Sequence, residues 1–255
     1  MTRALHERVH WVTEWSREIP AEQWQTYAQV LDRAAGRGIP FALGGAFAMA
    51  ALTGFWRDTK DLDIYVLPEH REALMDVLTS LGFSDYYAIK PYDRWWIYRA
   101  NRGEIIVDAI WAMANHRAQI DDLWMSGPEI ELRGRRLKVL PVEAVLWDKL
   151  YIMQRERCDW PDVMNVLYWT ATEVDWEYLL ERIGNDRPLM AAALTVFRWL
   201  SPGRAAGLPP WVWGCLGLPP NGVEGGGPRI VPERAELLDR RPWYGPDRSG
   251  SSKAA

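Results

Sequence analysis

This sequence of 255 residues contains few cysteines, no long apolar segment and no excess of positive charge. Two cysteines, Cys158 and Cys215, cannot build a framework of disulfides and belong to no zinc-binding motif, which favours a reducing compartment. No segment approaches the roughly 20 apolar residues of a membrane span. The first ten residues also lack the apolar core of a signal peptide. We therefore expect a cytoplasmic protein with no membrane partner.

The charge balance excludes a second class of proteins. The chain has 30 basic and 34 acidic residues, a net charge of −4 with histidine neutral. Binding to nucleic acid without sequence preference depends on neutralising phosphates, so this balance argues against it. The one dense basic segment, residues 133–138, is most simply a solvated hairpin turn, and contact with a polyanionic acceptor is the alternative.

The order of the predicted elements indicates an α+β fold. Helices are expected at residues 5–16, 20–37, 46–52 and 69–81, strands at 39–43, 62–67, 85–99 and 104–111, and a hairpin at 130–139. These elements predict a mixed sheet with flanking helices over residues 1–140. A helical part follows over 141–200, beginning with a helix at 143–155. Residues 201–255, rich in Pro, Gly and Trp, are expected to be irregular and to end in a flexible tail.

A diglycine followed by two aspartates suggests the chemistry. Gly44 and Gly45 end a short predicted strand, and Asp61 and Asp63 lie on the next one. Side chains alternate along a strand, so these two carboxylates share a face and repel each other unless positive charge lies between them. Mg²⁺ binds carboxylates together with substrate phosphates, and glycine lets backbone N–H groups approach an anion. The pattern therefore favours phosphoryl or nucleotidyl transfer.

A third carboxylate, Asp108, lies inside the strongly β-prone apolar segment 104–111. A carboxylate in such a segment is costly to bury unless it is paired or bound to a metal. Asp108 is therefore a candidate for the same site.

These motifs resemble the nucleotidyltransferase superfamily related to DNA polymerase β. In that superfamily a diglycine precedes an Asp-hydrophobic-Asp strand, and a third carboxylate lies on a later strand. A more local resemblance is to small bacterial nucleotidyltransferases, including antibiotic-modifying enzymes and AbiEii-like toxins, whose Arg-x-Thr-x-Asp-hydrophobic-Asp pattern is matched from Arg57 and Thr59 onward. One departure is Ala46, where many relatives have Ser.

The resemblance covers roughly residues 35–170 and includes a downstream segment. There, Lys149, Arg155, Asp159 and Asp162 match the family's Lys, Arg and Asp-x-x-Asp positions. Lys149 either offsets the charge of a bound triphosphate or only pairs with Asp159 or Asp162.

The resemblance implies a nucleotidyltransferase that moves a nucleoside monophosphate from an NTP, such as ATP, to an acceptor hydroxyl and releases pyrophosphate. It assigns Asp61, Asp63 and Asp108 to catalysis and to Mg²⁺, or Mn²⁺, with Asp108 on the acceptor side. The residues implied in nucleotide binding are Gly44, Gly45, Arg57, Thr59 and Lys149.

Two alternatives stay open from the sequence. One is a catalytically inactive protein of the same fold that only binds nucleotide or a partner. The other is an AbiEii-like toxin that modifies RNA and pairs with a small helical antitoxin. The sequence leaves open the acceptor, whether small molecule, RNA or protein, as well as the preferred base and the oligomeric state.

Overall fold

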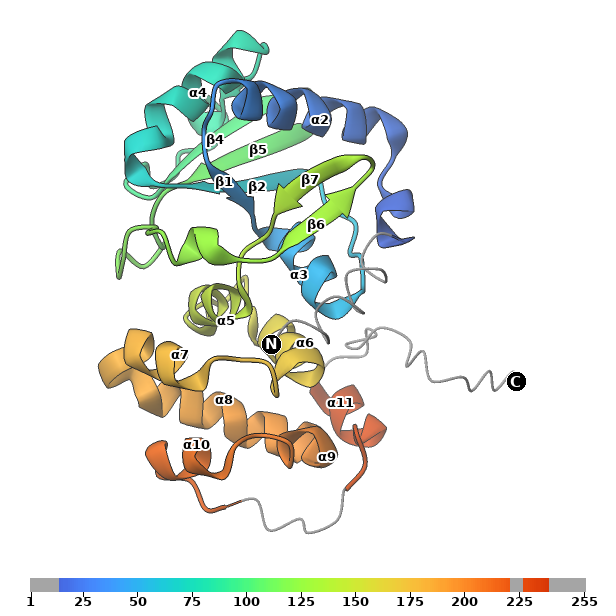
Figure 1. Ribbon diagram of the computed structural model, residues 1–255, viewed down its shortest axis with the longest axis vertical. Helices are drawn as coiled ribbons and strands as arrows, with labels where there is room; N and C mark the ends of the chain where they lie inside the picture. The colour runs from blue at the N-terminus through green and yellow to red at the C-terminus, as the bar shows by residue number, and fades with distance from the viewer. Residues whose placement is uncertain (1–13, 221–226, 239–255) are drawn as a thin grey trace, which may run out of the picture. The chain divides into compact units, whose positions relative to one another are not determined.

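The computed structural model describes residues 14–220 and 227–238 (Figure 1). The chain divides into two compact units, Met1–Val145 and Leu146–Ala255. The first is a mixed sheet with flanking helices and the second is helical, so the predicted α+β fold is confirmed. The flexible tail expected at the end of residues 201–255 lies outside the described residues, and so does the helix expected at 5–16 up to residue 13; from there the structure has a short 3₁₀ helix, η1 (Glu14–Glu18).

The first unit is built on a five-stranded sheet. Its strands, in order across the sheet, are β1 (Phe41–Leu43), β2 (Asp61–Val66), β5 (Ile105–Ile110), β4 (Ile97–Arg102) and β3 (Ser84–Asp85). Only β2 and β5 are parallel neighbours. Leu62 and Ile64 on β2 alternate with less buried aspartates. This period-two pattern gives the sheet one apolar face and one face that carries the aspartates.

Helices and a hairpin pack around this sheet. The helices α2 (Ala21–Gly36) and α4 (Arg71–Ser80) pack side by side over one face (Figure 1). Helix α3 (Gly45–Thr53) connects β1 to β2 and packs on β2. The hairpin of β6 (Glu129–Leu132) and β7 (Arg135–Lys138) lies beside β1. The remaining 3₁₀ turns of this unit are η2 (Pro68–His70), η3 (Tyr86–Ala88) and η4 (Trp124–Ser126).

The hairpin also contacts the segment just before α2, residues 15–19. Arg133 donates from its guanidinium to the carbonyl oxygens of Ser16 and Ile19 at 2.6 and 2.7 Å. Trp15, 2% exposed, stacks on Trp56 with ring centroids 5.1 Å apart. These contacts bind residues 15–19 to the body of the unit.

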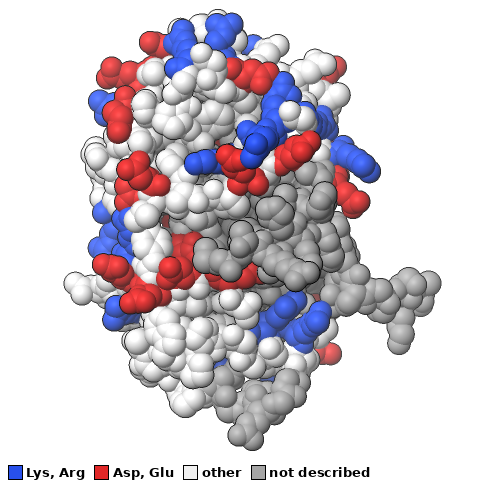
Figure 2. Space-filling model, viewed as in Figure 1, with Lys and Arg blue, Asp and Glu red and all other residues white. Residues whose placement is uncertain are grey.

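The predicted hairpin is confirmed, but two of its arginines bind other parts of the unit and are not simply solvated. Arg133 is engaged as described above, and Arg135 makes a bidentate ion pair with Asp32 at 2.7 and 2.6 Å. On the face shown in Figure 2, acidic and basic side chains are interspersed and form no broad basic surface among the described residues.

The strand expected over residues 85–99 was wrong for most of its length. Strand β3 ends at Asp85, whose Oδ1 accepts a hydrogen bond from the backbone N–H of Tyr87 and turns the chain into η3. Pro91 follows, where no backbone N–H is available for a ladder. The ladder resumes only at Ile97, so most of the aromatic segment 92–98 lies in a loop.

The described residues of the second unit form six further helices after α5 (Val142–Leu150), whose sequence spans the boundary between the units. They are α6 (Trp160–Thr170), α7 (Trp176–Ile183), α8 (Arg187–Leu200), α9 (Pro202–Ala205), α10 (Pro210–Cys215) and α11 (Pro232–Leu238), with the turn η5 (Gly184–Asp186) between α7 and α8. The helix expected at 143–155 ends at Leu150.

The irregular structure expected from residue 201 onward was also wrong in part. Helices α9, α10 and α11 each begin with a proline, which suits a first helical turn because its missing N–H needs no partner there. No described helix has the length and apolar character needed to cross a membrane.

Candidate active site

The diglycine packs directly against the carboxylate strand. The backbone N–H of Gly44 donates to the carbonyl oxygen of Asp63 at 3.0 Å. Gly45 has φ +47°, and a Cβ there would lie 1.7 Å from Oδ2 of Asp63. A Cβ at Gly44 would lie 2.2 Å from Cε2 of Tyr65. Both positions therefore exclude a side chain, and the start of α3 comes close to a carboxylate that its N-terminal dipole stabilises.

Strand register places three charged side chains in one row. Asp63 on β2 is the parallel partner of Asp108 on β5, and Asp108 is the antiparallel partner of Arg99 on β4. Partners in register point to the same face of a sheet, and Asp61, two residues before Asp63, shares that face. The structure thus brings the three predicted aspartates to one face of neighbouring strands.

An arginine that the sequence analysis missed binds the third aspartate. Arg99 donates from Nε to Oδ1 of Asp108 at 2.8 Å and from Nη2 to Oδ2 at 2.5 Å. The Asp108 side chain is 2% exposed and that of Arg99 is 32% exposed. The hydrogen bonds to Asp108 raise the pKa of Arg99, and the charges of Asp61 and Asp63 raise it further. Positive charge therefore already lies among the carboxylates.

The donors fit a metal ion only in part. Asp61 and Asp63 are half-buried carboxylates on one face of a strand, the kind of ligand that Mg²⁺ takes together with phosphate oxygens. Within residues 14–220 and 227–238, however, no group of three or more His, Cys, Asp or Glu is placed to hold a metal ion. The three-carboxylate metal site stays a prediction, and Asp108 enters it already engaged by Arg99.

The loop before β2 is held from α2. Oγ1 of Thr59 accepts from the backbone N–H of Asp61 at 3.2 Å, and its carbonyl oxygen accepts from the side-chain amide of Gln23. Gln23 also donates to the hydroxyl of Tyr27 at 2.7 Å. Burial raises the pKa of Tyr27 to about 12, helped by the nearby negative charges of β2. Thr59 thus positions the start of the carboxylate strand, while Arg57 is exposed.

In the second unit, Lys149 lies in a buried ion cluster. Its Nζ donates to Oδ2 of Asp159 and to Oδ2 of Asp162, both at 2.8 Å. Arg157 makes a bidentate pair with Asp159 at 2.9 and 2.8 Å. Burial opposes the charged form of Lys149, but the two carboxylates overcome it and raise the pKa of the ammonium. The structure shows the pairing that the sequence left open, and a contact with nucleotide stays a prediction.

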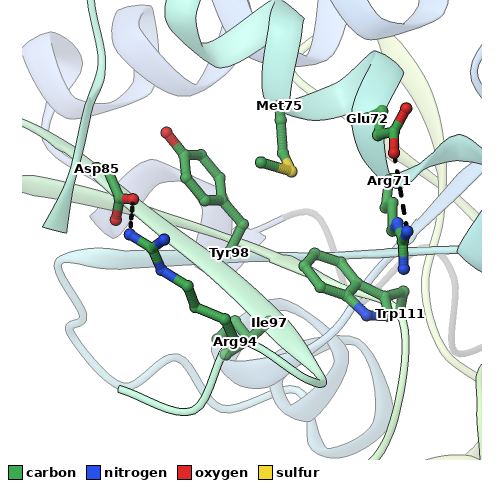
Figure 3. Close-up of a pocket in the computed structure, with 8 residues that line it drawn as sticks. All are labelled: Arg71, Glu72, Met75, Asp85, Arg94, Ile97, Tyr98 and Trp111. Carbon is green, nitrogen blue, oxygen red and sulfur yellow. Dashed lines mark hydrogen bonds and ion pairs between the residues drawn. The ribbon is translucent and has the colours of Figure 1, made fainter. Parts of the chain in front are cut away.

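A separate cavity of about 330 Å³ lies on the α4 side of the sheet (Figure 3). Its lining residues are Arg71, Glu72, Met75, Asp85, Arg94, Ile97, Tyr98 and Trp111. Arg94 pairs with Asp85, and Arg71 lies 3.7 Å from Glu72. The charged residues that line this cavity therefore pair with one another, and none of the residues predicted for the active site lines it.

Comparisons with known proteins give the family. Residues 20–201 match the model of a protein family described as uncharacterised nucleotidyltransferase. The comparison with curated proteins finds no match.

Similar solved structures have low sequence identity. A solution structure of the antibiotic-resistance factor ANT(2'')-Ia is 20% identical, with a TM-score of 0.48, over 68% of this chain and 96% of that one. The lincomycin-bound lincosamide antibiotic adenylyltransferase LnuA is 16% identical, with a TM-score of 0.41, over 56% and 94%. An antigenic nucleotidyltransferase-like protein from Paracoccidioides brasiliensis is 18% identical, with a TM-score of 0.41, over 69% and 94%. Because the family match spans well over half of its length, the chain belongs to this nucleotidyltransferase family.

Proposed function

We propose that the chain moves a nucleoside monophosphate from an NTP to an acceptor hydroxyl. The acceptor oxygen forms a bond to the α-phosphorus, and the bond from that phosphorus to the oxygen bridging to the β-phosphate breaks. Pyrophosphate leaves, and the hydroxyl proton ends in the solvent. Both the attacking and the leaving oxygen carry charge in this displacement, so the site has to stabilise charge at two places.

One observation carries this proposal: the glycine turn and the carboxylates form one packed unit. Gly45 excludes any side chain against Asp63, and Asp63 is in register with Asp108. A glycine that served only to begin a helix would not need a carboxylate beside it, yet a Cβ built on Gly45 would lie 1.7 Å from Oδ2 of Asp63. In the proposal the backbone at Gly44 and Gly45 approaches the triphosphate, with Arg57 reaching it from the loop before β2.

Asp61 and Asp63 would hold Mg²⁺, or Mn²⁺, together with the triphosphate. Bound there, the ion would offset the charge that develops on the phosphates and the leaving oxygen. Asp108, on the neighbouring strand, would lie on the acceptor side of these two carboxylates. Thr59 fixes the start of β2 and so the direction in which both metal-binding carboxylates point.

We propose a small molecule as the acceptor in preference to RNA. The net charge is −4, and Arg133 and Arg135, in the one dense basic segment, are held by Ser16, Ile19 and Asp32. An acceptor that carries many phosphates would find few unengaged cations in this segment. Modification of RNA by an AbiEii-like toxin with a helical antitoxin is the other outcome of the test below.

The experiment is incubation of the protein with each α-labelled NTP, Mg²⁺ and a cell extract, followed by separation into small molecules, RNA and protein. Label in the small-molecule fraction is expected. Asp61→Asn and Asp63→Asn should abolish it, and Asp58→Asn, an exposed residue of the preceding loop, is the matched control and should retain it. Label in RNA would assign the toxin reaction, and no transfer despite nucleotide binding would assign the binding-only alternative.

We propose a cytoplasmic location on the low cysteine content.

A further inference from the structure

The carboxylate face carries a fixed cation where the aspartates alone would repel one another. Arg99 lies on β4, in register with Asp108, and its side chain reaches both carboxylate oxygens of that residue. We propose that Arg99 takes the place of a second metal ion, so that one divalent ion, held by Asp61 and Asp63 with the triphosphate, serves the reaction. This inference rests on the proposed function and names the metal content of that same site.

The geometry of the Arg99–Asp108 pair supports a permanent cation at this position. A guanidinium matches a carboxylate with two parallel hydrogen bonds, and here these measure 2.8 and 2.5 Å. The Asp108 side chain is 2% exposed, so a second ion would have to displace the guanidinium from a nearly closed position. A guanidinium keeps its charge at every physiological pH, which makes Arg99 a permanent substitute for an exchangeable ion.

The position of Arg99 relative to the other aspartates supports the same assignment. The row Asp63, Asp108, Arg99 crosses three adjacent strands, β2, β5 and β4, on one face. Neighbouring strands lie roughly 5 Å apart, so the backbone of Arg99 is two strands away from β2 while its guanidinium reaches back to both carboxylate oxygens of Asp108. One cation is therefore fixed at Asp108, and Asp61 and Asp63 on β2 are the carboxylates that would take an ion arriving with the nucleotide.

Counting bound Mn²⁺ tests the inference. The probes are Mn²⁺ and the four NTP analogues in which a methylene group replaces the oxygen between the α- and β-phosphates, so that no transfer occurs. Equilibrium dialysis of the whole chain should give one Mn²⁺ per bound analogue. Asp108→Asn should leave one Mn²⁺ bound with an affinity within about twofold of the wild type, whereas Asp61→Asn should weaken Mn²⁺ binding more than tenfold, by at least the roughly 1.4 kcal/mol that one decade represents. Two ions in the wild type, or a lost ion in Asp108→Asn, would overturn the inference.

Variants of Arg99 test its own part. Arg99→Gln removes the cation and should allow a second Mn²⁺ to bind at Asp108, while Arg99→Lys keeps the charge and should still give one ion. A single ion in folded Arg99→Gln would show that Arg99 does not replace the second metal. Should Arg99→Gln not fold, the ion counts of the wild type, Asp108→Asn and Arg99→Lys decide, and two ions in any of them contradict the inference. Analogue binding that is the same with and without a chelator would refute the metal-dependent proposed function and not the role of Arg99 alone.

Discussion

Lys149→Met is expected to destabilise the second unit by about 3 kcal/mol. The ammonium is the shared partner of Asp159 and Asp162, and its side chain is 9% exposed. Removing one partner of a buried ion pair costs about 3–5 kcal/mol, because a charge is left in a poorly solvated place. The lower end applies because Arg157 still binds Asp159. Methionine fills the volume of the aliphatic stem, so no large cavity adds to the loss.

Urea denaturation followed by tryptophan fluorescence and by circular dichroism measures this loss. The control is the triple variant Lys149→Met, Asp159→Asn, Asp162→Asn, which has no buried carboxylates at these positions and should recover at least half of the stability. A loss below about 1 kcal/mol in the single variant would refute the reasoning, because such a value is typical of a solvent-exposed pair. Nucleotide affinity is measured on the folded variant without urea. If Lys149 also contacts a triphosphate, Lys149→Met lowers this affinity; if it does not, the affinity is unchanged.

The remaining predictions concern the site and the response to acid. Gly45→Ala should abolish nucleotide binding in a calorimeter, since its Cβ would displace Asp63, whereas Gly38→Ala, with φ +70° and no atom within 4 Å, should cost only about 1 kcal/mol of stability. Asp63→Asn should keep the melting temperature and lower kcat at least about 100-fold, and loss of the folding transition would instead make Asp63 structural. For Asp159, burial alone would raise the pKa, but the hydrogen bond from Arg157 and the Lys149 charge lower it from 3.8 to about 2. A lowered pKa stabilises the fold above pH 3.8, so about 2 kcal/mol should disappear as the pH falls from 4 to 2, and Asp159→Asn should lack this loss in acid titrations.

The candidate site could be predicted from local patterns where the chemistry is local. Alternation along one strand places Asp61 and Asp63 on one face, and a β-prone apolar segment singles out Asp108 as a candidate. The register that makes Asp108 a neighbour of Asp63 joins parallel strands separated by a long connection, and no local signal fixes such a pairing. The pairing of Arg99 with Asp108 is predictable from the sequence, because a tight turn at Gly103 between two antiparallel strands puts residue 99 opposite residue 108.

The errors in the fold prediction have the opposite cause, because a local interaction overrides a correct propensity. Aromatic residues favour strands, yet the side chain of Asp85 hydrogen-bonds the backbone N–H of Tyr87 and ends β3 there. A high proline content predicts irregular structure after residue 201, yet Pro202, Pro210 and Pro232 each begin a helix. In both regions, composition was a poorer guide than the position of a single side chain.

The segment before α2 has a practical consequence for anyone who shortens this chain. The family match begins at residue 20, which suggests a natural starting point for expression of a minimal enzyme. Starting there would remove Trp15 from its stack on Trp56 and would delete both carbonyl acceptors of Arg133, Ser16 and Ile19. The half-buried guanidinium of Arg133 would then lose both of these hydrogen-bond acceptors, while the removal of Trp15 would expose apolar surface beside α3, the helix that follows the diglycine. A trimmed protein of this kind would be expected to aggregate, and its inactivity would say nothing about the catalytic residues.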